Sequence, residues 1–307
     1  MTTCLVTGGA GFIGSHIVEA LIKRGDTVRV LDDLSTGNVD NLSAVREQID
    51  FIEGSVTDET TVQRAVAGTN FIFHLAAMVS VPVSMEQPVL AEQTNALGTL
   101  NVLQAAKNNG TQRVVLSSTA AIYGDEPTLP KLENMLPHPK SPYAISKLAG
   151  EYYCQLFNQA FGVETVALRY FNAFGPRQDP SSPYSGVISI FLDKLQQGVA
   201  PTIFGDGGQT RDFVFVTDVA QANLLASQVP QAAGQVFNIG TGMQVSLNQL
   251  FDTLADILAF NKKPAYQPTR SGDIRYSVAD ATKAREVLGW LPQVTFEDGL
   301  RQLVESM

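Results

Sequence analysis

Short runs of apolar and β-branched residues alternate with amphipathic stretches through the first half of the chain. Residues 12–23 show the helical pattern most clearly, because Ile13, Ile17, Ala20 and Leu21 recur on one face. Strand-like runs occupy residues 4–7, 27–31, 51–53, 71–74, 113–117 and 163–169. Strands that alternate with helices predict an α/β fold, in which a doubly wound parallel sheet carries helices on both faces.

The pattern changes after about Phe174. Glycine, proline and serine become dense between residues 175 and 183, and the elements that follow look shorter and mixed. We therefore predict a first domain over residues 1–174 and a smaller C-terminal α/β domain over residues 175–307. We also expect some later segments of the chain to cross back to the first domain.

Composition narrows the class of protein. The 307-residue chain has 44% hydrophobic and 17% charged residues, which is typical of a soluble globular protein. Its net charge of −9 argues against nucleic acid as a partner, because nucleic-acid-binding surfaces are basic. No apolar run approaches the roughly 20 residues of a membrane helix, and early glycines interrupt the first apolar run, so we expect neither a membrane partner nor a secretory signal.

The cysteines and histidines suggest no metal site and no disulfide framework. Cys4 and Cys154 lie in apolar patterns, and the three histidines are far apart in the sequence. We therefore expect no metal ligands, and this cysteine usage fits a protein of the reducing cytoplasm.

A glycine-rich loop over residues 7–14, Thr-Gly-Gly-Ala-Gly-Phe-Ile-Gly, joins the first predicted strand to the first predicted helix. Such a loop lets a pyrophosphate approach the backbone at a helix N-terminus, although an ordinary strand-to-helix turn can look the same. Asp32 at the end of the second strand favours a dinucleotide, and specifically NAD, since a carboxylate there binds ribose hydroxyls and repels a 2′-phosphate. Asp33 is the alternative. The loop residues expected at the cofactor are Gly8, Gly11, Phe12, Ile13 and Gly14.

Tyr143 and Lys147 form a candidate acid–base pair, because four-residue spacing places them one turn apart on a helix. Ser141 is a suitable N-cap for that helix, and Pro142 suits its first position. The helix dipole and the ammonium group are expected to lower the pKa of the phenol toward neutrality. A Tyr and a Lys at this spacing also occur by chance, so the apolar strand that ends in hydroxyl residues 117–119 strengthens the interpretation.

Taken together, these motifs resemble the extended short-chain dehydrogenase/reductase family, and within it the UDP-sugar 4-epimerases. The resemblance extends over nearly the whole chain and implies a Rossmann-like first domain for NAD and a second domain mainly for the UDP-sugar. Its motifs are the glycine loop, His74-Leu75-Ala76-Ala77, Asn95, residues 117–119, Tyr143 with Lys147, residues 169–172 (Arg-Tyr-Phe-Asn), residues 205–207 (Gly-Asp-Gly), residues 211–213 (Arg-Asp-Phe) and Gly289-Trp290.

The resemblance also implies roles for individual residues. Thr119 takes the catalytic hydroxyl position, Tyr143 is the base, and Lys147 binds the nicotinamide ribose and lowers the pKa of the tyrosine. Further cofactor contacts are implied for Ser55, Val56, Leu75, Ala76, Ala77, Asn95, Ser117 and Tyr170. Substrate contacts are implied for Ser80, Thr119, Tyr143, Asn172, Phe204, Arg211, Arg270 and Ser277.

Several of these roles have structural alternatives. Arg211 and Arg270 are expected to clamp the diphosphate, but they could equally form surface salt bridges. Phe204 is expected to stack on the uracil, although a core phenylalanine is nearly as good a reading, and Trp290 is assigned to packing. Ser55 stands where the family commonly has an aspartate for the adenine amino group, so that contact is expected to be weaker.

The implied reaction is inversion at C4 of a UDP-hexose through a transient 4-keto sugar. Related dehydratases carry an Asp-Glu pair directly after the threonine, whereas Ala120 and Ala121 stand here, so elimination has no evident catalyst. A UDP-glucuronate 4-epimerase or another NAD-dependent nucleotide-sugar enzyme is the alternative, and a non-enzymatic NAD-binding regulator is the least favoured. The small Ser277 is expected to leave room for an N-acetyl group. A homodimer formed through helices 95–106 and 147–161 is also expected from the family.

Overall fold

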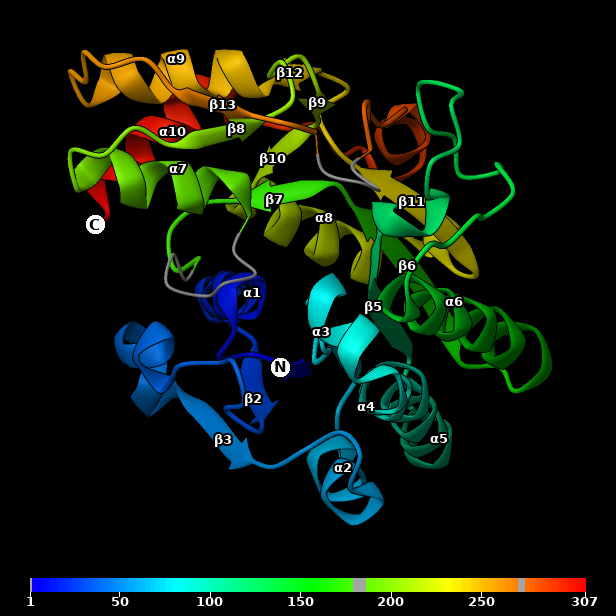
Figure 1. Ribbon diagram of the computed structural model, residues 1–307. Coiled ribbons are helices and arrows are strands. Elements are labelled where there is room, and N and C mark those ends of the chain that lie inside the picture. Colours follow the sequence, from blue (N-terminus) through cyan, green and yellow to red (C-terminus); the bar gives the residue numbers. More distant parts are fainter. Residues whose placement is uncertain (1, 179–185, 270–273) are drawn as a thin grey trace.

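The computed structural model describes residues 2–178, 186–269 and 274–307. Seven parallel strands form its central sheet in the order β11-β6-β5-β4-β1-β2-β3, which is the Rossmann-like doubly wound arrangement predicted from the sequence (Figure 1). The strands are β1 (Thr3–Thr7), β2 (Thr27–Asp32), β3 (Ile49–Glu53), β4 (Phe71–His74), β5 (Arg113–Thr119), β6 (Glu164–Tyr170) and β11 (Gln235–Ile239).

Helices cover both faces of this sheet, which explains why the strands are nearly continuous apolar runs. On one face lie α1 (Phe12–Arg24) and α8 (Val216–Gln228), whose buried residues join a single cluster with the strands. On the other face lie α2 (Glu59–Val66), α5 (Gly98–Asn109) and α6 (Pro142–Ala160). The helices α3 (Val81–Glu86) and α4 (Pro88–Ala91) and a π-helix at Glu92–Leu97 precede α5.

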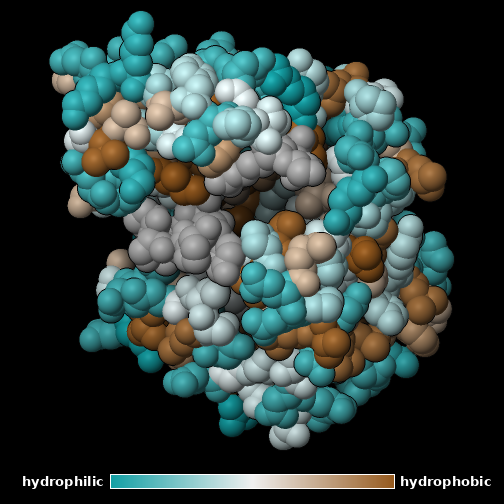
Figure 2. Space-filling model, in the orientation of Figure 1, coloured by the Kyte–Doolittle hydropathy of each residue, from teal (hydrophilic) through white to brown (hydrophobic). Residues whose placement is uncertain are grey.

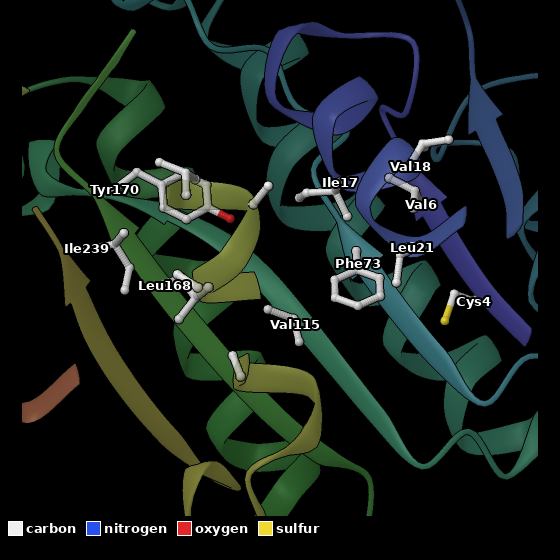
Figure 3. Close-up of a cluster of buried hydrophobic side chains, with 14 of the residues drawn as sticks. Cys4, Val6, Ile17, Val18, Leu21, Phe73, Val115, Leu168, Tyr170 and Ile239 are labelled. Atoms are coloured by element: carbon white, nitrogen blue, oxygen red, sulfur yellow. The ribbon is translucent and has the colours of Figure 1, made fainter. Parts of the chain in front are cut away.

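The core on the α1 face contains residues from the beginning, the middle and the end of the sequence. Figure 3 shows Cys4, Phe73 and Val115 from neighbouring strands beside Ile17 and Leu21 of α1. Trp290 belongs to the same cluster, is fully buried, and donates its indole N–H to the carbonyl oxygen of Asp218 at 2.9 Å, so its assignment to packing is confirmed.

A second, smaller core lies away from the sheet, in the upper part of Figure 1. Aromatic rings dominate it: the rings of Phe174 and Phe215 lie 5.4 Å apart between centroids, and those of Phe213 and Phe296 stack at the same distance. Its elements are β7 (Asn172–Phe174), α7 (Val187–Gln196), β8 (Thr202–Phe204), β9 (Thr210–Arg211), β10 (Phe213–Phe215), β12 (Val245–Ser246), α9 (Leu247–Ile257), β13 (Ala265–Gln267) and α10 (Phe296–Glu305).

The chain returns from this second part to the sheet. After β10 it forms α8, which packs on α1, and then β11, which pairs in parallel with β6. A short π-helix at Ala284–Leu288 adds two more buried residues to the first core. Within the described residues, no helix is long and apolar enough to cross a membrane.

Candidate active site

The glycine loop forms a cradle in which side chains do not fit. Gly8 has φ of +68°, and a Cβ built there would lie 2.7 Å from the amide nitrogen of Ala76. A Cβ on Gly14 would lie 2.0 Å from the carbonyl oxygen of Gly8. The loop therefore packs directly against the backbone after β4 and leads into α1, whose N-cap, Gly11, has no side chain to occupy the helix end. This geometry suits the pyrophosphate of NAD.

Asp32 is the buried carboxylate beside this cradle. It is 6% exposed and accepts hydrogen bonds from the backbone N–H groups of Ala10 and Leu34, both at 2.9 Å. Burial raises its pKa. Asp33, the alternative, is exposed and accepts from Ser35, so Asp32 fits the ribose position better.

Ser55, which stands where the family commonly has an aspartate, is the residue expected near the adenine of NAD. Ser55 follows β3, and its hydroxyl accepts hydrogen bonds from the amide and the hydroxyl of Thr57. Val56 beside it is buried. Asp58 caps α2 by accepting from the N–H of Thr60 at 3.1 Å, so its side chain has a structural use.

The catalytic candidates meet where β5 ends and α6 begins. Ser141 caps α6 by accepting from the N–H of Ala144, and Pro142 opens the helix, both as predicted. Tyr143 shares a hydrogen bond with the side chain of Thr119. One turn later, Lys147 donates to the hydroxyl of Ser117 at 3.3 Å. The structure thus brings together a phenol, an ammonium group and two hydroxyl groups that lie far apart in the sequence.

The pKa of Tyr143 differs from the expectation. Burial raises it, and the hydrogen bond with Thr119 opposes this only in part. Burial also lowers the pKa of Lys147 to about 8. The nearby Cys154 and Glu151 act to raise this pKa and offset the lowering only in part. The expected lowering of the phenol pKa was therefore wrong for the chain alone, because desolvation outweighs the hydrogen bond with Thr119.

Asn95 and His74 brace the site from within. The Asn95 amide donates to the hydroxyl of Ser146 at 3.0 Å, and Ser146 donates to the carbonyl oxygen of Tyr143 at 2.9 Å. The Asn95 side chain also exchanges hydrogen bonds with the backbone of Met78. In this structure Asn95, predicted as a cofactor contact, holds the catalytic helix.

His74 has a defined tautomer. Thr99 donates to the carbonyl oxygen of Asn95, so its hydroxyl accepts from His74 Nε2 at 3.0 Å. Burial lowers the pKa of His74 to about 3, so the ring is neutral and carries its proton on Nε2. His74 Nδ1 therefore accepts from the hydroxyl of Thr7 at 2.7 Å, and the ring joins the end of β1 to α5.

The predicted substrate residues lie on several elements. Asn172 opens β7 with an exposed side chain, and Phe204 ends β8 half-buried. Arg211 Nη1 donates to the carbonyl oxygen of Ile274 at 2.7 Å, and Ser277 donates its N–H to the carbonyl oxygen of Thr210. The segment that carries Ser277 is thus tied to β9, whereas Arg270 lies outside the described residues.

The remaining predicted contacts lie around the cradle. Leu75, Ala76 and Ala77 follow β4 in half-buried positions, and Ser80 caps α3 by accepting from the N–H of Val83 at 3.2 Å. The hydroxyl of Tyr170 donates to Asn223 Oδ1 at 3.0 Å in the core.

A buried ion pair behind the candidate catalytic residues was not predicted from the sequence. Glu151 forms an ion pair with Arg169 and accepts from Ser118. The signal was present, because Glu151 follows Lys147 by one more helical turn and Arg169 belongs to the quoted motif 169–172. The described residues contain no group of three side chains suited to a metal ion.

Comparison with known proteins identifies the family. Residues 4–240 match the NAD dependent epimerase/dehydratase family. A UDP-glucose 4-epimerase of Mycolicibacterium smegmatis is 40% identical over 305 residues, which span 98% of this chain and 97% of that protein. The crystal structure of UDP-glucose 4-epimerase from Thermotoga maritima with UDP-glucose superimposes with a TM-score of 0.95 at 44% identity, covering 99% of this chain and 98% of the other.

The name of a third relative refers to an acetylated sugar. The UDP-N-acetylglucosamine 4-epimerase from Methanobrevibacter ruminantium, in complex with UDP-N-acetylmuramic acid, gives a TM-score of 0.95 at 38% identity, covering 99% of this chain and 97% of the other. Identity above 30% over nearly whole chains, together with the family match, is decisive. The protein belongs to the NAD dependent epimerase/dehydratase family.

Proposed function

We propose that this protein interconverts UDP-glucose and UDP-galactose by NAD-dependent inversion at C4. The observation that carries the proposal is the contact of Tyr143 with Thr119, with Lys147 one helical turn away. These residues lie at the carboxyl-terminal ends of the strands, where the glycine cradle also lies. The relatives named UDP-glucose 4-epimerase support the choice of sugar.

The proton transfer is carried out by Thr119, Tyr143 and Lys147. Thr119 binds the C4 oxygen of the sugar beside the phenol and orients its proton toward Tyr143. Tyr143 takes that proton as the alcohol is oxidised and returns it when the ketone is reduced. Lys147, held in place by Ser117, supplies the positive charge that stabilises the tyrosinate. When bound, NAD supplies the hydride acceptor, and the glycine cradle and Asp32 would hold it.

Inversion also requires that the 4-keto sugar present its other face. The diphosphate must therefore stay fixed while the sugar turns, which calls for cationic and amide groups at the phosphates. We assign Arg211, Arg270 and Asn172 to this anchor, and Phe204 to the uracil. The hydrogen bond from Arg211 to the Ile274 carbonyl oxygen keeps Arg211 beside the segment that carries Ser277.

The small side chain of Ser277 supports a wider sugar range. It is half-buried on a segment fixed by the Thr210 carbonyl oxygen and by Asp212, which accepts from the N–H of Ala279 at 3.0 Å. We propose that UDP-N-acetylglucosamine and UDP-N-acetylgalactosamine are also interconverted, since a hydroxymethyl side chain leaves room for an acetamide. The relative named UDP-N-acetylglucosamine 4-epimerase is consistent with this.

The assay must separate epimerases from related enzymes. Purified protein should convert UDP-galactose to UDP-glucose, with the products resolved by chromatography, and denaturation should release NAD rather than NADP. UDP-glucuronate is the comparison substrate, because a relative with 30% identity is named UDP-glucuronate 4-epimerase. Inversion of UDP-glucuronate alone would replace the hexose assignment, and binding of NAD without turnover of any UDP-sugar would indicate a regulator.

We also propose a homodimer. Ile145, Tyr152 and Leu156 recur on one face of α6 and are 49%, 57% and 48% exposed, and Leu97 beside them is 46% exposed. Hydrophobic side chains gather over α3, α4 and α6 on the face shown in Figure 2. A second copy of the same helices would bury this row of side chains.

We also propose a cytoplasmic location. The two free cysteines, Cys4 and Cys154, are buried, which suits a reducing compartment.

A further inference from the structure

The face of α6 that carries Tyr143 and Lys147 continues to Glu151. This carboxylate is 4% exposed, and it holds both Nε and Nη2 of Arg169, at 3.0 and 2.7 Å. It also accepts from the hydroxyl of Ser118 at 2.5 Å. Ser118 and Arg169 are register partners on β5 and β6, so one carboxylate joins the catalytic helix to both strands.

Arg169 continues the network beyond β6. Its Nη1 donates to the hydroxyl of Tyr123 at 2.9 Å and to the carbonyl oxygen of Glu133 at 3.1 Å. The Tyr123 hydroxyl in turn donates to Asn238 Oδ1 on β11 at 2.6 Å. The charged groups are thus buried with several hydrogen-bond partners, which is the condition under which a buried ion pair is tolerated.

The two ends of this network flank Thr119. Ser118 precedes it on β5, and Tyr123 closes the 3₁₀ turn Ala120–Tyr123 that follows it. Inside that turn, Thr119 accepts from the N–H of Ala121 at 3.1 Å. The position of Thr119 is therefore fixed on one side by Glu151 and on the other by Arg169.

We propose that the Glu151–Arg169 ion pair is a positioning element of catalysis, which sets Thr119 and Ser117 against Tyr143 and Lys147. The inference rests on the proposed function, because it assigns a purpose to the geometry of that reaction. Glu151 and Arg169 touch the catalytic segments without being among the reacting groups. Their effect is on alignment, and small misalignments in an active site cost large factors in rate.

Glu151 has an electrostatic effect as well. The titratable or charged groups near Lys147 are His74 from β4 and, from its own helix, Tyr143, Glu151 and Cys154. Burial lowers the pKa of Lys147, and Glu151 opposes that lowering. Loss of this carboxylate should therefore deprotonate Lys147 at lower pH.

The test compares two ion pairs on the same two strands. Glu164 pairs with Arg113 at the start of β5 and β6, at the opposite ends of these strands from the candidate catalytic residues. Glu164→Gln is therefore a matched control. Glu151→Gln should lower kcat for UDP-galactose roughly 10- to 100-fold. The KM and the amount of retained NAD should change by less than about twofold, since both side chains of the ion pair are buried and neither is a predicted cofactor or substrate contact. Glu164→Gln should leave kcat within about twofold of the wild type.

The pH profile separates positioning from simple loss of stability. In Glu151→Gln the alkaline limb of kcat should move to lower pH by roughly half a unit or more, because Lys147 loses a neighbouring negative charge. Unchanged kcat and an unchanged limb would overturn the proposal. A loss of activity that is equal at every pH and accompanied by loss of bound NAD would also overturn it.

A second variant covers the case in which Glu151→Gln fails to fold because Arg169 is left unpaired. The double change Glu151→Gln with Arg169→Met removes both charges and should fold. Its kcat should still fall, since Tyr123 loses its donor, and wild-type kcat in this variant would overturn the proposal. An inactive wild type would overturn the proposed function as well, so the two failures are distinguishable.

Discussion

At Tyr143, burial and hydrogen bonding act in opposite directions on one hydroxyl group. Burial favours the neutral phenol, whereas the contact with Thr119 favours the anion. The balance raises the pKa, so the phenol of the chain alone is protonated at neutral pH. The proposed role of Tyr143 as a base therefore requires positive charge next to the ring beyond that which Lys147 supplies in the chain alone.

Replacement of Tyr143 by phenylalanine tests this role directly. Tyr143→Phe keeps the ring and removes the proton acceptor, so kcat should fall by at least about 10²-fold while UDP binding is retained. Turnover of UDP-galactose and calorimetric titration with UDP provide the two measurements. Tyr153→Phe is the matched control on the same helix, because the ring of Tyr153 packs against the core. Near-normal turnover in Tyr143→Phe would reject the site.

His74 gives a prediction about stability. Its pKa is about 3 in the folded chain against an ordinary 6.5, chiefly because it is buried. The unfolded chain therefore binds more protons between these values, so the free energy of unfolding falls as pH drops below 6.5, by up to about 1.4 kcal/mol per unit. His74→Gln should weaken this slope in urea titrations at pH 7 and pH 5. An unchanged slope would mean that other groups carry it.

At the scale of elements, residues 274–279 are the segment that we propose limits the size of the sugar. It is fixed to β9 through Ser277 and to Asp212 through Ala279, so a larger side chain at Ser277 cannot easily move away. Ser277→Tyr should abolish turnover of UDP-N-acetylglucosamine and largely spare UDP-glucose, as measured side by side. Ser277→Ala, which stays small, should retain both. Equal loss on both sugars in Ser277→Tyr would place the size limit elsewhere.

Local pattern was sufficient to predict six of the seven strands of the sheet, β1 to β6, but not the seventh. The helix expected at residues 12–23 is α1 (Phe12–Arg24), and the glycine loop precedes it as predicted. The strand at residues 235–239 was not predicted, since five residues far from β6 carry little signal of pairing. The Glu151–Arg169 pair was missed for another reason: its helical spacing from Lys147 is visible in the sequence, but each side chain looks like an exposed charge until the fold buries it.

At the scale of the molecule, the apolar row on α6 predicts the assembly. Tyr152→Glu with Leu156→Glu places two charges in the proposed interface and should convert a dimer to a monomer, as measured by light scattering. Ile190→Glu is the control, because Ile190 is similarly exposed, at 42%, on α7. A wild type that is monomeric, or a double variant that remains dimeric, would contradict the proposed interface.

The late entry of β11 and Trp290 into the first core has a consequence for synthesis. When residues 1–174 have left the ribosome, the outer edge of β6 is unpaired and the cluster around Leu168 and Ile17 lacks its indole. Nascent chains add roughly 5–20 residues per second, so this intermediate persists for seconds with an open strand edge. We therefore expect that completion of the core around the sheet follows, rather than precedes, the emergence of the residues that form the second core, and that chaperones are most needed in this interval.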